Sequence, residues 1–175
     1  MRAGYRFVSA ALFLASVLGM AFALFLEHVR GLEPCPLCIF QRIGLIGLGI
    51  ISLVALLHHP KSNIGKRIYA LLASLSILWS AGVAARHVWL QNLPPDKVPS
   101  CGPGLEYWVE TLPMKAVFEQ VLTGSGECAK VDWTFLGQSL PVWSLIFFSI
   151  LFIACLWQLF RRYEDVPVQR LRDKY

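Results

Sequence analysis

Charged residues are scarce in this chain. They make up 15% of its 175 residues, whereas an ordinary soluble domain contains roughly 25%. Apolar residues reach 56%, more than a soluble fold of this size can bury, and they gather in long uncharged runs, the pattern that a lipid bilayer selects. The scarcity of charge excludes an ordinary soluble domain and predicts a single membrane domain over residues 1–175.

The formal net charge of +5 does not indicate a nucleic-acid-binding protein. That function would require basic residues clustered on a folded soluble face. In this chain the lysines and arginines lie at the edges of the apolar runs. We therefore expect the lipid bilayer, and no nucleic acid, as a partner.

Four of the apolar runs are long enough to cross a bilayer as helices. A helix rises about 1.5 Å per residue, so roughly 20 residues span a hydrocarbon core of about 30 Å. The runs are continuously apolar, whereas the strands of a membrane barrel alternate in polarity. We predict an all-α membrane protein, a bundle of four transmembrane helices at about residues 7–26, 39–57, 68–90 and 142–160.

Lysine and arginine in short loops mark the cytoplasmic side of a membrane protein. Ten of the sixteen lie before the first run, between the second and third, or after the fourth: Arg2, Arg6, Lys61, Lys66, Arg67, Arg161, Arg162, Arg170, Arg172 and Lys174. Both termini are therefore predicted to be cytoplasmic, with loops at about residues 27–38 and 91–141 on the other side. The first run imitates a secretory signal, but it is longer than the usual signal core, and we expect it to remain as a helix.

Four of the five cysteines fall in the two outer loops. Cys35 and Cys38 belong to the short loop, and Cys101 and Cys128 to the long one. Disulfides persist in the periplasm and its equivalents and are rare in the cytosol, so an even number of outward cysteines indicates redox-active or disulfide-bonded residues. Cys155 lies inside the last apolar run, where we expect it to act only as a small hydrophobic residue.

The segment Cys35-Pro36-Leu37-Cys38 stands directly before the second predicted helix. Proline is favoured at the first helical position, so both sulfurs should lie at a helix N-terminus, where the positive dipole end and the Cys-X-X-Cys spacing lower the pKa of a thiol. Arg42 follows Cys38 by four residues and so shares its helical face. Arg42 either extends to the lipid headgroups or holds a thiolate or polarises an electron-accepting carbonyl group. Ionisable residues inside membrane segments favour the second interpretation.

Two other interpretations of the cysteines remain open. A structural zinc site needs a second pair of closely spaced ligands, but 26 residues separate Cys101 from Cys128, so we expect no metal. A non-enzymatic scaffold with an outer loop closed by disulfides would account for this pair. It would not explain Cys35 and Cys38 beside Arg42.

The long outer loop carries the pattern of a short amphipathic helix. Met114, Val117, Phe118 and Val121 stand at positions i, i+3, i+4 and i+7. Proline and glycine clusters interrupt regular structure on both sides of this segment. A helix of this kind would lie on the membrane surface.

Together these features resemble the DsbB family of bacterial inner-membrane disulfide-forming proteins. The resemblance spans nearly the whole chain and rests on the cysteine motif with Arg42, on Cys101 and Cys128 between the third and fourth runs, and on segments 126–133 and 135–137. It implies a multi-pass protein of the bacterial inner membrane with periplasmic cysteine loops.

The resemblance implies a protein-disulfide:quinone oxidoreductase. A Cys101–Cys128 disulfide would be reduced by a DsbA-like periplasmic thioredoxin-fold oxidase, with Cys101 forming the mixed disulfide. Cys128 would then attack Cys35 in a second disulfide, Cys35–Cys38. The released Cys38 would pass the electrons to a membrane quinone, ubiquinone being the expected one.

The resemblance also assigns quinone binding to Arg42 and His87. His87 lies near the outer end of the third predicted helix, in a placement similar to that of a family residue near the quinone. The alternative for a histidine at such a position is a merely amphipathic residue at the interface. The neighbouring Arg86 is expected to extend to the interface.

Overall fold

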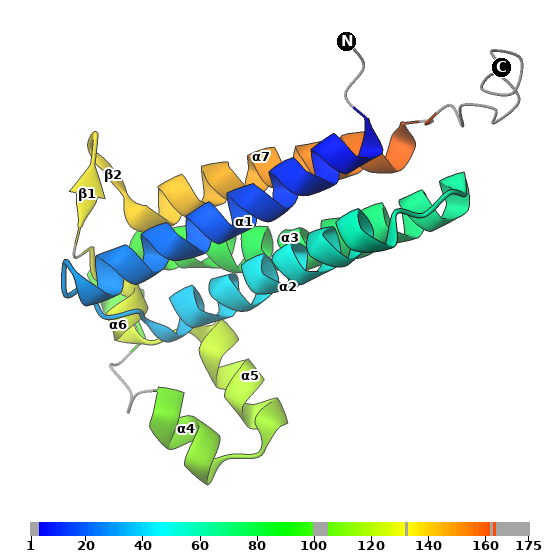
Figure 1. Cartoon of the computed structure of the whole chain (residues 1–175). Coiled ribbons are helices and arrows are strands. Elements are labelled where there is room, and N and C mark those ends of the chain that lie inside the picture. Colours follow the sequence, from blue (N-terminus) through cyan, green and yellow to red (C-terminus); the bar gives the residue numbers. More distant parts are fainter. Residues whose placement is uncertain (1–3, 100–104, 132, 162, 164–175) are drawn as a thin grey trace, which may run out of the picture.

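Four long helices form a bundle in the computed structural model, which describes residues 4–99, 105–131, 133–161 and 163 (Figure 1). The four helices are α1 (Tyr5–His28), α2 (Pro36–His58), α3 (Asn63–Gln91) and α7 (Leu140–Phe160). Each is long and apolar enough to cross a membrane. The predicted all-α fold with four such helices is confirmed.

Each helix extends past the apolar run that predicted it, and for α2, α3 and α7 a capping residue or a proline marks an end that hydropathy does not. Ser62 begins α3, since its hydroxyl oxygen accepts a hydrogen bond from the Gly65 N–H at 3.1 Å. Pro36 occupies the first turn of α2 and Pro141 that of α7, where a missing N–H costs nothing. His59 ends α2 in the left-handed conformation.

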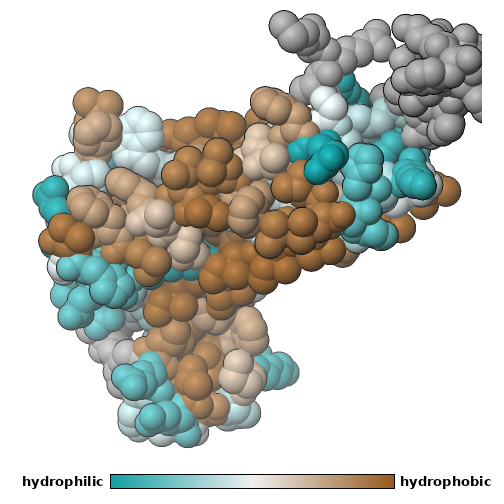
Figure 2. Space-filling model, in the orientation of Figure 1, coloured by the Kyte–Doolittle hydropathy of each residue, from teal (hydrophilic) through white to brown (hydrophobic). Residues whose placement is uncertain are grey.

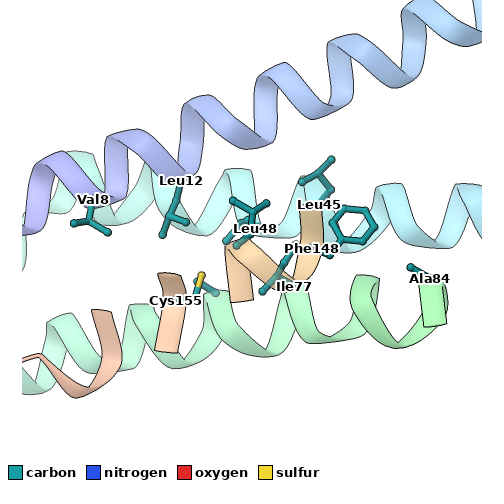
Figure 3. Close-up of a cluster of buried hydrophobic side chains, with 10 residues drawn as sticks. Val8, Leu12, Leu45, Leu48, Ile77, Ala84, Phe148 and Cys155 are labelled. Carbon is teal, nitrogen blue, oxygen red and sulfur yellow. The ribbon is translucent and has the colours of Figure 1, made fainter. Parts of the chain in front are cut away.

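The core of the bundle lies where these four helices face one another (Figure 3). It includes Val8, Leu12, Leu45, Leu48, Ile77, Ala84, Phe148 and Cys155. The outward side chains are also apolar, so a belt of hydrophobic surface covers the bundle between more polar ends (Figure 2). An apolar exterior around an apolar core is the arrangement that hydrocarbon requires.

Serine hydroxyls join neighbouring helices through backbone carbonyls. The Ser76 hydroxyl donates to the Gly44 carbonyl at 2.9 Å, and the Ser80 hydroxyl to the Gln41 carbonyl at 2.8 Å, which ties α3 to α2. The Ser16 hydroxyl of α1 donates to the Leu45 carbonyl at 2.5 Å. Small hydroxyl residues let membrane helices approach closely and satisfy polar groups away from water. These bonds fix the first turns of α2 against α3.

The segments that carry Cys35, Cys38 and Cys128 lie at one end of the bundle, here called the loop end, where α1 ends and α2 begins. The start of α1, the α2–α3 connection and the end of α7 lie at the other end (Figure 1). The long connection from α3 to α7 contains η1 (Pro95–Lys97), α4 (Leu105–Thr111), α5 (Met114–Thr123), α6 (Gly126–Ala129) and the strands β1 (Thr134–Phe135) and β2 (Gln138–Ser139). The strands pair antiparallel, with Thr134 opposite Ser139.

The predicted amphipathic helix corresponds to α5, and its apolar residues divide between two surroundings. Val117 and Val121 are buried against Leu37 of α2 and Leu90 of α3. Met114 and Phe118 remain exposed, while α4 and α5 project away from the bundle (Figure 1). The helix is therefore attached to the bundle by one part of its apolar surface and presents the other part outward.

Candidate redox site

Cys35 and Cys38 occupy the start of α2. Cys35 is the N-cap residue, Pro36 begins the helix, and Cys38 lies in its first turn. The two sulfurs are free thiols 3.2 Å apart, and both side chains are partly buried. The unpaired amides at a helix N-terminus stabilise a thiolate. A Cys35–Cys38 disulfide, with a bond of about 2.05 Å, stays a prediction that the closeness of the sulfurs permits.

His87 of α3 is buried and lies across both sulfurs. Its Nε2 is 3.8 Å from Cys35 Sγ, and its Nδ1 is 3.9 Å from Cys38 Sγ. The Gln41 amide nitrogen lies 3.4 Å from Nδ1, within hydrogen-bond distance of the ring. The sequence associated this histidine only with the quinone, and the structure brings it to the cysteines as well.

Cys128 of α6 lies against Cys35 from the loop side. A hydrogen bond with Cys35 raises the pKa of the Cys128 thiol, and burial raises this pKa further. The Ser125 hydroxyl lies 3.7 Å from its sulfur. Cys35 therefore has Cys38 on its own helix and Cys128 from the loop as sulfur neighbours. Cys101 lies outside the described residues, so the predicted Cys101–Cys128 pair stays a prediction.

Two side chains of α3 hold the segment that carries Cys128. Arg86 donates from Nε to the Leu122 carbonyl at 3.0 Å and from Nη2 to the Thr123 carbonyl at 3.1 Å. On the other side of Cys128, the Gln91 amide donates to the Lys130 carbonyl at 3.2 Å. Both ends of the segment are thus attached to α3, one on each side of His87.

Arg86 makes specific contacts that the sequence did not indicate. Its guanidinium lies 4.0 Å from the centre of the Trp89 ring, a cation–π contact that orients it. From there it binds the last carbonyls of α5, which a helix end leaves without partners. Its position beside His87 was the signal that could have identified it.

A cavity of about 570 Å³ lies beside the cysteines, between α1, α2 and α7. Small-molecule sites commonly measure roughly 300–1,000 Å³. Its apolar wall includes Leu18, Gly19, Phe22, Leu45, Phe147 and Phe148. Its polar lining includes Cys35, Cys38, Gln41, Arg42, His87 and Gln91. Such a cavity suits a ligand with a greasy body and a polar group near the sulfurs.

Arg42 lines this cavity and turns toward α1. Its Nη1 donates to Glu27 Oε2 at 2.5 Å, and its Nη2 to the Ala23 carbonyl at 3.5 Å. Glu27, for which no sequence pattern indicated a role, neutralises the cation at the membrane edge and so lowers the cost of placing it there. Because a guanidinium carries five N–H donors, these two contacts leave donors for a ligand in the cavity.

Aromatic side chains form the cavity wall at the β1–β2 hairpin. Trp133 and Phe135 stack with ring centres 6.0 Å apart and planes 5° from parallel. The Trp143 indole N–H donates to the Phe135 carbonyl at 3.0 Å. Trp133 and Trp143 both line the cavity, so the hairpin positions two indole rings at its loop end.

A family model described as disulfide bond formation protein DsbB matches residues 5–158. The chain belongs to the DsbB family. It is 68% identical over 163 residues to a protein of Acinetobacter baumannii named Disulfide bond formation protein B, covering 93% of this chain and 95% of the relative. A protein of the same name from Acinetobacter baylyi is 67% identical over 170 residues, which cover 97% of this chain and 99% of the relative. A protein of the same name from a Psychrobacter species is 56% identical over 159 residues, which cover 90% of this chain and 92% of the relative.

The family match confirms the resemblance that the cysteine motif and the outer loop indicated. With its four apolar helices, this DsbB-family chain is a multi-pass membrane protein. Three of its cysteines, Cys35, Cys38 and Cys128, lie together at the loop end.

Proposed function

We propose that the chain is a membrane thiol oxidoreductase that reoxidises a DsbA-like periplasmic oxidase and passes the electrons through two cysteine pairs to a membrane quinone. The observation that carries this proposal is the contact of Cys35 with both Cys38 and Cys128 beside an apolar cavity. The names of the relatives, which refer to disulfide bond formation, support the same chemistry.

The first exchange takes place at the outer pair. A thiolate of the reduced partner attacks Cys101 in the Cys101–Cys128 disulfide, forms a mixed disulfide and releases Cys128 as a thiolate. The second thiol of the partner then attacks the mixed disulfide, and the partner leaves oxidised. Two electrons and two protons have now reached Cys101 and Cys128.

The second exchange transfers these electrons to the inner pair. Cys128 attacks Cys35 of the Cys35–Cys38 disulfide, which forms a Cys35–Cys128 bond and releases Cys38 as a thiolate at the start of α2. Cys101 then attacks Cys128, which restores the outer disulfide and releases Cys35. The proximity of Cys128 to Cys35 supports this route, because the attacking sulfur needs no long movement.

The cavity residues fit a quinone. When bound, a quinone supplies an acceptor for two electrons and two protons. Arg42 is placed to donate a hydrogen bond to a carbonyl oxygen, because its guanidinium lines the cavity that the Cys38 side chain also lines. His87, between the two sulfurs, is placed to receive a thiol proton or to hold one on Nε2. The apolar wall would exclude water from this transfer.

The charges of the chain support an inner-membrane orientation with the loop end in the periplasm. Lys61 lies between α2 and α3, and Lys66 and Arg67 lie in the first turns of α3, at the end of the bundle where α1 begins and α7 ends. That end would face the cytoplasm, with both termini, because positive loops remain inside. Residues 1–175 would then form one membrane domain whose cysteines meet the periplasmic partner.

Turnover by the purified full-length chain tests this proposal. The protein in detergent is supplied with a reduced thioredoxin-fold oxidase and a soluble ubiquinone analogue, and quinone reduction is followed by absorbance. We expect turnover that Cys38→Ser or Cys101→Ser abolishes and Cys155→Ser preserves, because Cys155 lies in the core of the bundle.

Each alternative predicts a different result in the same preparation. A scaffold closed by disulfides would reduce no quinone. A structural zinc site would retain about one zinc per chain in the oxidised protein as purified. Either result would contradict the relay.

A further inference from the structure

We propose that Cys35, Cys38 and His87, once the two cysteines are reduced, form a binding site for a thiophilic divalent cation of the zinc class. We infer further that occupation of this site stops electron transfer. The site follows from the geometry of the three residues, whereas the inhibition rests on the function proposed above.

The three side chains already have nearly the spacing that such an ion needs. One ligand atom from each residue lies within 4.8 Å of the other two. A tetrahedral zinc with sulfur at about 2.3 Å and nitrogen at about 2.0–2.1 Å sets its ligand atoms roughly 3.5–3.8 Å apart. The nearest sulfur–nitrogen distances are 3.8 Å from Cys35 to Nε2 and 3.9 Å from Cys38 to Nδ1, and the sulfurs are 3.2 Å apart. For an ion to bind, the sulfurs need to separate by about half an ångström and the imidazole ring needs to turn so that one nitrogen faces both sulfurs.

The chemistry of the donors matches a zinc-class ion. Thiolate and imidazole are the ligands that zinc favours over carboxylate-preferring ions such as Mg²⁺. Two thiolates and one divalent cation sum to zero charge, and a neutral complex suits a partly buried position at the membrane edge. Binding would release the two thiol protons. The N-terminus of α2 further favours the thiolate forms.

A neighbouring amide can support the imidazole as a ligand. Gln41 lies 3.4 Å from His87 Nδ1. If Nε2 binds the ion, Nδ1 carries the ring proton, and the Gln41 amide turned over presents its oxygen as the acceptor. Metal-binding histidines commonly have such a partner for the second nitrogen. All three ligand residues line the cavity, from which a water molecule would supply the fourth ligand.

The site exists in only one redox state. A Cys35–Cys38 disulfide offers no thiolate, so the oxidised chain keeps His87 alone of the three ligands. The ion therefore captures the inner pair after it has received electrons and before it passes them on. A zinc-class ion takes up no electrons, and it would hold both sulfurs away from further exchange.

Cobalt titration of the full-length chain tests the site without partner or quinone. The chain in detergent is reduced, freed of reductant under argon and titrated with Co²⁺. We expect a thiolate-to-cobalt charge-transfer absorption that saturates near one ion per chain and is displaced by Zn²⁺. The oxidised wild type should show no such absorption, and this comparison leaves the sequence and the fold unchanged.

Variants identify the ligands. His87→Gln and Cys38→Ser should each weaken Co²⁺ binding by about tenfold or more, since loss of even a supporting partner costs about 10–100-fold. Cys155→Ser and Cys101→Ser should bind as the wild type does. A reduced wild type without the charge-transfer absorption, or an unchanged affinity in His87→Gln, would overturn the site.

A second measurement concerns inhibition. In the quinone-reduction assay, Zn²⁺ should stop turnover, and a chelator should restore it. Full turnover in a chain shown to hold Zn²⁺ would overturn the inhibition. Because the cobalt titration contains neither quinone nor partner, failure of the relay would leave its result intact, and failure of the site would leave the turnover assay intact.

Discussion

Replacing Arg86 by glutamine should detach the segment that carries Cys128 from α3. The guanidinium makes two hydrogen bonds to the Leu122 and Thr123 carbonyls, at 3.0 and 3.1 Å. Glutamine keeps a polar side chain, but it is shorter and lacks the fork that binds two carbonyls together. The attachment through Gln91 to Lys130 would remain, so the segment should loosen at one end only.

The size of the effect follows from these two bonds. A net hydrogen bond contributes about 0.5–1.5 kcal/mol, and the lower half of that range applies because both bonds are exposed to solvent. Loss of both therefore costs about 1–2 kcal/mol of docking free energy. That corresponds to a roughly 5–30-fold smaller ratio of docked to undocked segment, and so to a smaller docked population.

The effective concentration of Cys128 at Cys35 measures that population directly. In a Cys38→Ser, Cys101→Ser background, Cys35 and Cys128 are left to form a disulfide with each other. Equilibration in glutathione buffers of graded potential gives the ratio of bonded to reduced chain. We expect Arg86→Gln to lower the effective concentration, by at most about 5–30-fold.

A matched control removes a cation from the docked segment itself without touching these carbonyls. Lys115 of α5 is largely exposed, and its amine lies 3.9 Å from the Glu119 carboxylate. Lys115→Gln should leave the effective concentration unchanged. An Arg86→Gln value equal to that of the parent would refute the reasoning, because it would show that the two hydrogen bonds do not hold Cys128 in place.

Three further predictions concern the core, the loop and pH. Ile77→Ala should lower the free energy of unfolding in detergent by about 2–5 kcal/mol, since Ile77 is fully buried. Leu75 faces outward, so Leu75→Ala should lower this free energy far less. Similar losses for the two variants would contradict the prediction. Gly124→Ala should displace α5, because Gly124 has a φ of 88° and an added Cβ would collide with the Leu90 side chain. The glutathione assay should then report a lower effective concentration of Cys128 at Cys35. An unchanged effective concentration would contradict this prediction. Because contact with Cys35 and burial raise the pKa of Cys128, this thiol stays protonated in the folded chain after it ionises in the unfolded one. Its contribution to stability should therefore fall as pH rises above about 8.5, and iodoacetamide at pH 9 should modify it more slowly in the folded than in the unfolded chain. Equal rates would speak against the raised pKa.

The four long helices could be predicted from the sequence because hydrocarbon imposes length and composition together. Their ends could not be read from hydropathy alone, since a residue such as Ser62 begins a helix through a side-chain hydrogen bond. The short elements α4, α6 and the hairpin carry too few residues for a periodic signal. The apolar periodicity did identify α5, because its spacing extends over two turns.

The candidate site was predictable where its residues are neighbours in sequence. The spacing of Cys35, Cys38 and Arg42 places them on adjoining turns of one helix. The position of His87 across both sulfurs depends on the packing of α3 against α2, over a separation of 49 residues from Cys38. The pairing of Arg42 with Glu27 depends in the same way on how α1 meets α2. No local pattern encodes such contacts.

The cavity wall formed by α1 has a consequence for how an acceptor reaches the site. Leu18 and Phe22 line the cavity and also belong to the exposed apolar surface of α1. An apolar acceptor would therefore arrive sideways from the lipid and leave the same way, without crossing water. The quantity that sets its occupancy is then its mole fraction among the lipids. Adding detergent at constant total acceptor should dilute it and lower the rate, even though its concentration per litre has not changed.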